Sequence, residues 1–135
     1  MKNDFIGKVT VMISVNQIRL FLNTLDKYID FIEHNFPRMK DDIIVFRDFV
    51  NVIKVANPQL MMTQYNKYVG KFRKEIEVYN DDFFLNLAET HFESEFMYDL
   101  FKKIREIWLD ADITDKKKAT VWFYIKTLLM ASEDT

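Results

Sequence analysis

The stretch "VWFYIKTLLM", residues 121–130, decides the fold, because almost all of its side chains are apolar. Thr114 precedes it at the position of a helix N-cap, and we predict a helix from Asp115 to about Ala131. A helix that is apolar on most of its sides is stable only where other elements surround it. The rest of the chain must therefore supply helices that pack around residues 121–130.

The composition favours such a fold. Two glycines and two prolines occur among 135 residues, whereas 49% of the residues are hydrophobic and 30% are charged. Such a chain has too few turn residues for many short strands, and its length suits one hydrophobic core. We predict an all-α fold: a compact bundle of about five helices, in a single domain over residues 1–135.

Apolar residues at intervals of three and four predict the first helix. It begins near Val15, where Ser14 and Gln17 have the spacing of a capping box, and Pro37 closes it. Residues 8–14 alternate in a β-branched setting, which is typical of a strand. They are either a short N-terminal strand or the lead-in to this helix.

Three further helices follow from capping residues and helix breakers. The acidic pair at 41–42 can cap a second helix over residues 43–56. The Asn-Pro pair at 57–58 starts a third, in which Gly70 predicts a bend or a close helix crossing. A fourth, of about five turns, ends at Trp108.

Residues 43–56 are apolar almost all round, as are residues 121–130, and a bundle of this size has room for one fully surrounded helix. The surplus predicts a protein partner or a homo-oligomer. Aromatic side chains are enriched in interface cores. The residues expected at this interface are Trp122, Tyr124, Phe123, Phe49 and Phe84. The alternative is a monomer in which loops and lysine stems cover these faces.

The connector "VYNDDFFLNL", residues 78–87, places two aspartates directly before two phenylalanines. Asp81 and Asp82 can cap or turn the chain while Phe83 and Phe84 enter the core, which would stabilise a non-helical link by about 1.5 to 3 kcal/mol per ring. In the alternative interpretation, an exposed Phe84 contacts a partner.

Lysine clusters support a second hypothesis, nucleic-acid binding. The formal net charge is −2, so the chain as a whole does not attract nucleic acid. One cluster, at the i, i+4, i+7 spacing of a helix face, comprises Lys67, Lys71 and Lys74. A second cluster comprises Lys116, Lys117 and Lys118. Neighbouring acidic residues dilute both clusters, and plain solubility is the simpler role.

Enzymatic motifs are weak. The loop "DADITD", residues 110–115, resembles an EF-hand calcium loop but has Asp115 in place of the required glycine. The acidic residues around His91 are typical of a solvated helix face, although they leave a hydrolase as a third hypothesis. We predict no enzyme activity, no metal, no cofactor and no small-molecule substrate.

Two features bear on location. The chain has no cysteine, which fits an intracellular setting. No apolar run reaches about 18 residues, and the first residues show no cleavage pattern of a signal peptide, so we expect neither a membrane span nor a secretory leader.

The order of features resembles small helical proteins of nucleocytoplasmic large DNA viruses, such as those of algae and other protists. The resemblance rests on "FLNTLDKYIDFIEHNFP" (21–37), "VANPQLMMTQYNKYV" (55–69), "NDDFFL" (80–85) and "IWLDADITDKKKATVWFYIKTLLMASE" (107–133). Gln59 and Asp82 depart from the arginine and glutamate often found in such relatives. The resemblance implies a small α-helical assembly or interaction protein of a virion or of an infected cell, in its cytoplasm or nucleus, and it transfers no catalytic residue.

Overall fold

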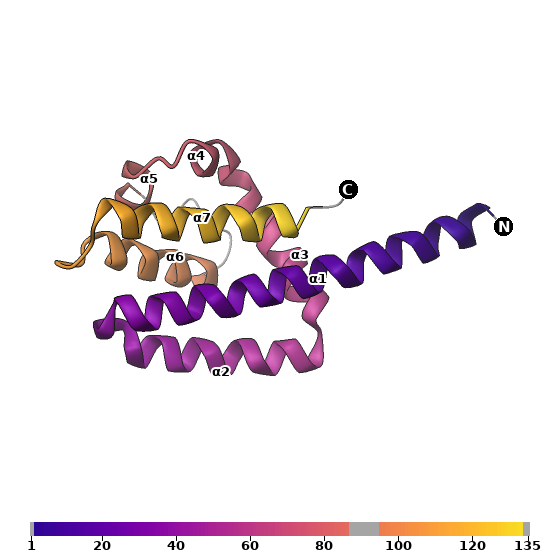
Figure 1. Ribbon diagram of the computed structural model, residues 1–135, viewed down its shortest axis with the longest axis horizontal. Helices are drawn as coiled ribbons and strands as arrows, with labels where there is room; N and C mark the ends of the chain where they lie inside the picture. The colour runs from indigo at the N-terminus through magenta and orange to yellow at the C-terminus, as the bar shows by residue number, and fades with distance from the viewer. Residues whose placement is uncertain (1, 87–94, 134–135) are drawn as a thin grey trace.

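The computed structural model describes the backbone of residues 2–86 and 95–133, and the side chains of residues 15–86, 98–99 and 101–133. Within these ranges the protein is all-α and contains no strand, as the predicted fold class requires (Figure 1). The helices are α1 (Lys2–Asn35), α2 (Lys40–Ala56), α3 (Pro58–Val69), α4 (Arg73–Glu77), α5 (Asp82–Leu85), α6 (Glu95–Trp108) and α7 (Asp115–Ala131). Short 3-10 turns occupy Pro37–Met39 and Gly70–Phe72.

The first helix is longer than the sequence suggests. α1 is continuous from Lys2, so the predicted start near Val15 and the alternative of an N-terminal strand are both wrong. A strand needs a neighbouring strand to satisfy its backbone groups, and the described residues offer none, whereas a helix satisfies them internally. Gln17 does not complete a capping box; its Nε2 donates to the carbonyl oxygen of Glu133 at 2.7 Å. This bond ties α1 to the residues that follow α7.

The caps predicted for Asn57 and Thr114 are confirmed, whereas the cap predicted for the acidic pair at 41–42 is not. The Asn57 side chain accepts from the Leu60 amide at 3.2 Å, and the Thr114 hydroxyl accepts from the Lys117 amide at 3.1 Å. At α2 the cap position is Met39, which makes no side-chain cap bond. The acidic pair at 41–42 lies instead in the first turn of α2, where negative charge is favourable beside the helix dipole.

The third helix is interrupted at Gly70, where the sequence predicts a bend. α3 ends at Val69, a 3-10 turn follows, and α4 begins at Arg73. Gly70 keeps right-handed helical angles (φ −58°, ψ −23°), and a Cβ built on it would lie 3.9 Å from Leu129 Cδ1. The interruption therefore lies where this segment crosses α7.

α7 is the central helix and α2 is an outer one. α7 packs against α1, α3 and α4 and buries one side chain after another along its length, whereas α2 packs mainly against α1 and α3. Figure 1 shows α1 lying between α2 and α7. Of the two helices predicted to compete for the centre, residues 121–130 are mostly enclosed and residues 43–56 are not. The apolar surplus thus lies on α2.

The connector at residues 78–87 is held to the core by two of its side chains, those of Asp81 and Phe84. Phe84 is fully buried, with ring centroids 4.7 Å from those of Trp108 and of Trp122. Asp81 Oδ1 accepts a hydrogen bond from Trp122 Nε1 at 2.9 Å. The core role predicted for Phe84 is therefore correct, and the alternative of an exposed Phe84 is wrong. The aspartate beside the phenylalanines satisfies the polar atom of a buried tryptophan.

Candidate functional site

A groove of about 610 Å³ opens beside α2. Its floor comes from α1 and α7, and its walls come from α2, α3 and α6. The side chains that line the wall on α2 are Met39, Asp42, Ile43, Val45, Phe46, Phe49 and Ile53, counting the turn before the helix. The opposite walls include Leu60, Met61, Ile104 and Ile107. Sites that hold ligands or partner side chains commonly have volumes of roughly 300 to 1,000 Å³ and an apolar lining.

Two phenols from α1 and α3 contribute to this groove. Tyr65 donates its hydroxyl proton to the carbonyl oxygen of Ile125 at 2.8 Å, and its ring lies 5.4 Å from that of Phe21. Burial, with a smaller contribution from Tyr28, holds the pKa of Tyr65 well above its usual range. Burial likewise raises the pKa of Tyr28. Both phenols therefore stay protonated at neutral pH and act as neutral parts of an apolar wall.

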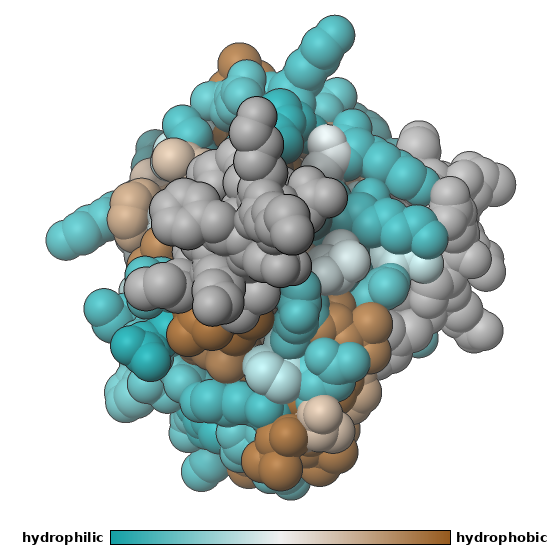
Figure 2. Space-filling model, turned by 90° about the vertical axis from the view of Figure 1, so that its right-hand side faces the viewer, coloured by the Kyte–Doolittle hydropathy of each residue, from teal (hydrophilic) through white to brown (hydrophobic). Residues whose placement is uncertain are grey.

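The outer face of α2 carries an exposed apolar strip next to the groove. We define the α2 strip as Val45, Phe49, Val52 and Ala56, which are all exposed and follow one another at intervals of four, three and four. Val45 is 70% exposed and Val52 is 68% exposed. These intervals correspond to the a and d positions of a heptad repeat, the pattern by which helices pack on one another. Figure 2 shows apolar atoms at the lower edge of the molecule, where α2 meets α3.

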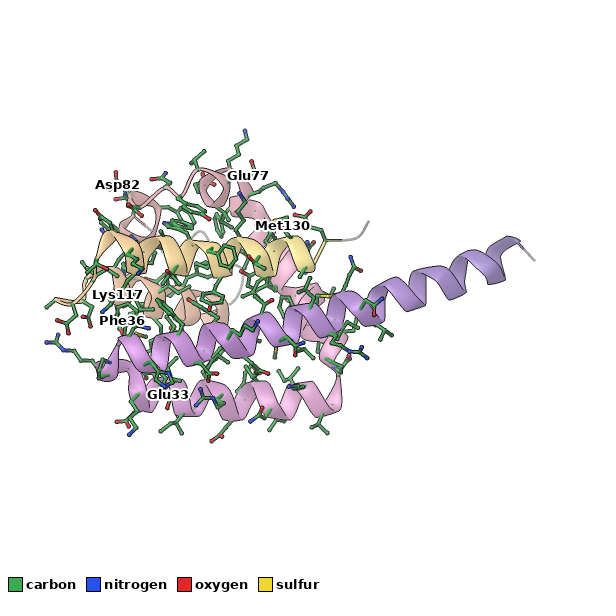
Figure 3. All side chains as sticks on the ribbon, in the orientation of Figure 1. Glu33, Phe36, Glu77, Asp82, Lys117 and Met130 are labelled. Atoms are coloured by element: carbon green, nitrogen blue, oxygen red, sulfur yellow. The ribbon has the colours of Figure 1, made fainter. Side chains whose placement is uncertain are left out.

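The basic residues of α2 are held on its opposite side. Arg47 forms ion pairs with Asp30 and Glu33 of α1, and these acids raise the pKa of its guanidinium. Lys54 forms an ion pair with Asp26 of α1 at 3.3 Å. Figure 3 shows Glu33 between α1 and α2. These pairs fix the rotation of α2 about its axis, so that the α2 strip faces away from α1.

Charges of both signs border the groove. Asp42 and Asp99 line it together with Lys103, whose Nζ lies 3.4 Å from Asp42 Oδ1. Asp41 and Asp48 are exposed on the same helix as the α2 strip. An occupant with apolar side chains would match this surface.

The five aromatic residues predicted at the interface do not form one surface. Trp122 and Phe84 are buried in the core of the chain itself, so their assignment to a partner interface is wrong. Tyr124 is half-buried, with its ring 5.5 Å from that of Tyr28. Phe123 is 56% exposed on α7, and Phe49 is 38% exposed on α2. Only Phe49 belongs to the groove and the α2 strip.

The two lysine clusters differ in the contacts that their side chains make within the chain. Lys67 and Lys71 both lie over the ring of Tyr68, at 5.3 and 5.8 Å, and Lys74 is exposed on α4. Nearby, Arg73 is paired with Glu133. These lysines form a small basic surface, although the predicted shared helix is interrupted at Gly70.

In the second cluster, Lys116 is exposed and Lys118 is half-buried. Lys117 donates to the carbonyl oxygen of Asp112 at 3.2 Å and lies over the ring of Phe36, as Figure 3 shows. Lys117 therefore connects α7 to the end of α1, and this cluster offers less free charge than the sequence suggests.

In the described part of the chain, no group of three or more His, Asp or Glu side chains is arranged to hold a metal ion. In the "DADITD" loop, Asp110 Oδ1 accepts from the amide of Asp112 at 2.8 Å and so stabilises the turn. The acidic residues near His91 lie outside the described residues, apart from the exposed Asp99 and the backbone of Glu95.

Membrane insertion has no candidate helix in the ranges that the structure covers, since none is both long enough and apolar enough to cross a bilayer.

Comparisons with known proteins give no further assignment: no protein-family model, no curated protein and no solved structure matches this chain. The resemblance to viral proteins therefore stays a prediction.

The spacing of basic and apolar residues in α2 indicates the α2 strip, whereas the positions of the aromatic residues alone do not. Arg47 and Lys54 follow one another at an interval of seven, as do Val45 and Val52, but the two pairs lie on opposite faces of the helix. The basic face pairs with α1, so the valine face is left outward. The groove cannot be read from the sequence, because five helices build it.

Proposed function

We propose that this protein is a non-enzymatic assembly protein that self-associates through the α2 strip and the groove beside it. The observation that carries the proposal is the heptad spacing of the α2 strip on an outer helix whose Arg47 and Lys54 side chains form ion pairs with α1. Exposed apolar surface that borders an apolar groove is typical of an interaction site.

The energetics favour an interface larger than the α2 strip. Covering the exposed parts of Val45, Phe49 and Val52 would contribute about 1 kcal/mol each, since complete burial of such side chains is worth about 1.5 to 3 kcal/mol. Association costs about 4 to 15 kcal/mol in lost translational and rotational freedom. A symmetric contact between two α2 strips alone would thus be weak. A stable assembly requires an occupant that also fills the groove.

The test is light scattering over a wide range of protein concentration, applied to matched valine variants. Val52→Lys and Val45→Lys place a charge in the α2 strip, and we expect each to weaken self-association about ten-fold or more, equivalent to about 1.4 kcal/mol. Both positions are exposed, so the fold should survive each change.

Val78→Lys is the control, because Val78 is 72% exposed at the end of α4. Figure 1 shows α4 and α2 on opposite sides of the molecule. The control should associate like the parent chain. A parent chain that remains monomeric at every concentration would end the proposal.

Nucleic-acid binding through Lys67, Lys71 and Lys74 is the second candidate. It is favoured by the convergence of two of these side chains on one tyrosine ring. Binding of a labelled oligonucleotide should then fall steeply with salt and weaken in Lys67→Glu. No binding at low salt would exclude it.

The viral resemblance supplies a setting for the first proposal. An assembly protein of a large DNA virus would act in the virion or within an infected cell.

A further inference from the structure

We propose that the groove receives the N-terminal arm, defined as residues 2–14 of α1, from a second copy of the chain. This inference rests on the proposed self-association and identifies the segment that fills the groove. The occupant is a helix, and each copy would both give an arm and receive one.

The arm is positioned to reach another molecule. Figure 1 shows the N-terminal end of α1 extending well beyond the other helices. Gln17, bonded to the carbonyl oxygen of Glu133, marks where α1 meets the end of the chain's own α7 region. Because α1 is one continuous helix, the arm cannot turn back into the groove of its own chain without breaking that helix. Two arms and two grooves can close a two-fold dimer with no unfilled site.

The sequence pattern of the arm matches the surface that would receive it. Phe5, Val9 and Met12 follow one another at intervals of four and three, as do the first three residues of the α2 strip. Positions with this spacing share one face of a helix. Two helices with such faces pack with the side chains of one between those of the other, at about 8 to 10 Å between axes.

The charges are also complementary. The arm contains Lys2, Lys8 and Asp4, which gives a net charge of +1. The groove lining contains Asp42, Asp99 and Lys103, which gives a net charge of −1. Opposite charges at the edge of an interface favour the correct partner and speed its approach. A basic residue of the arm would be favourable beside Asp42 or Asp99.

Cross-linking between two single-cysteine variants tests the inference, since the chain has no cysteine of its own. A tagged Val9→Cys chain is mixed with an untagged Val52→Cys chain, allowed to exchange subunits and treated with a short bismaleimide. We expect a mixed dimer of intermediate size on a denaturing gel. Val78→Cys replaces Val52→Cys in the control mixture, because both valines are highly exposed. The mixed product should be at least about ten-fold more abundant with Val52→Cys than in this control.

The outcomes separate this inference from the proposal beneath it. If the parent chain dimerises but Val52→Cys couples only to itself, the two α2 strips face each other; the arm inference is then wrong and self-association stands. If Val9→Cys couples equally well to both partners, the arm has no defined site and the inference fails. If light scattering shows only monomer, both proposals fail.

Discussion

The side chain of Asp81 shows how one exposed residue fixes a buried one. Its carboxylate accepts the indole proton of Trp122, which is 1% exposed. Asp81→Ala would leave a buried donor without this acceptor, which costs about 1 to 3 kcal/mol. We expect urea denaturation to show that loss in the free energy of unfolding.

Two neighbouring variants control for this effect. Asp81→Asn keeps an acceptor oxygen and should lose clearly less stability than Asp81→Ala. Asp82→Ala removes only an exposed charge from the first turn of α5 and should cost about 0.3 to 1 kcal/mol. Equal losses for Asp81→Ala and Asp82→Ala would show that the bond to Trp122 adds nothing.

The phenols of the half-buried residues Tyr28 and Tyr65 predict how stability depends on pH. Their pKa values in the folded protein are raised above the ordinary value of about 10, chiefly by burial. The unfolded chain therefore loses these protons first as the pH rises. Their stabilising effect is complete below about pH 10 and is lost above it, by up to about 1.4 kcal/mol per pH unit for each phenol.

Urea midpoints measured from neutral pH to strongly alkaline pH check this prediction. Tyr65→Phe should lower stability by about 1 kcal/mol at neutral pH, because it removes the bond to Ile125. It should also make the alkaline decline shallower. An identical decline in both proteins would show that Tyr65 does not contribute to it.

At the scale of elements, Gly70 is the substitution that the fold would tolerate. Its backbone has ordinary helical angles, and an added Cβ would meet Leu129 at ordinary contact distance. Gly70→Ala should therefore raise the free energy of unfolding by about 0.4 to 1 kcal/mol, because it restricts the unfolded chain. Thermal or urea denaturation measures the change. A loss of stability would mean that the crossing of α3 and α7 is tighter than these angles and distances indicate.

The sequence predicts the elements well where a boundary has a local chemical cause. Asn57, Pro58 and Thr114 act through their immediate neighbours, and their helix starts are where the sequence places them. The predicted start of α1 near Val15 is wrong. The alternating β-branched residues before it resemble a strand, and only the structure shows that no partner strand lies beside them in the described residues.

The site was only partly predictable for a related reason. Whether an apolar residue is buried depends on helices far away in the sequence, as the contrast between buried Trp122 and exposed Val52 shows. The surplus of apolar residues was visible in the sequence, but its place on α2 was not. The ion pairs of Arg47 and Lys54 with α1 decide that place.

For the whole molecule, self-association predicts a melting temperature that rises with protein concentration. A partner that binds only the folded chain stabilises it in proportion to the logarithm of its concentration. Val52→Lys should move the onset of this dependence to about ten-fold higher concentration or beyond, while leaving the melting temperature of the dilute protein within a few degrees of the parent. Calorimetry over an about hundred-fold range of protein concentration would measure both the concentration dependence and the melting temperature of the dilute protein. A concentration-independent melting temperature in the parent chain would contradict the assembly.

The aromatic cluster around Phe84 also determines what fluorescence can report. The two tryptophans of the chain, at positions 108 and 122, lie in this cluster with ring centroids 5.7 Å apart, and both are shielded from water. Their emission should shift to longer wavelength when the core opens and change much less when a helix docks in the groove, because neither indole ring lines it. The tryptophan emission of the unmodified protein thus reports mainly on unfolding. Unfolding and self-association can therefore be followed separately in one sample, by fluorescence and by light scattering.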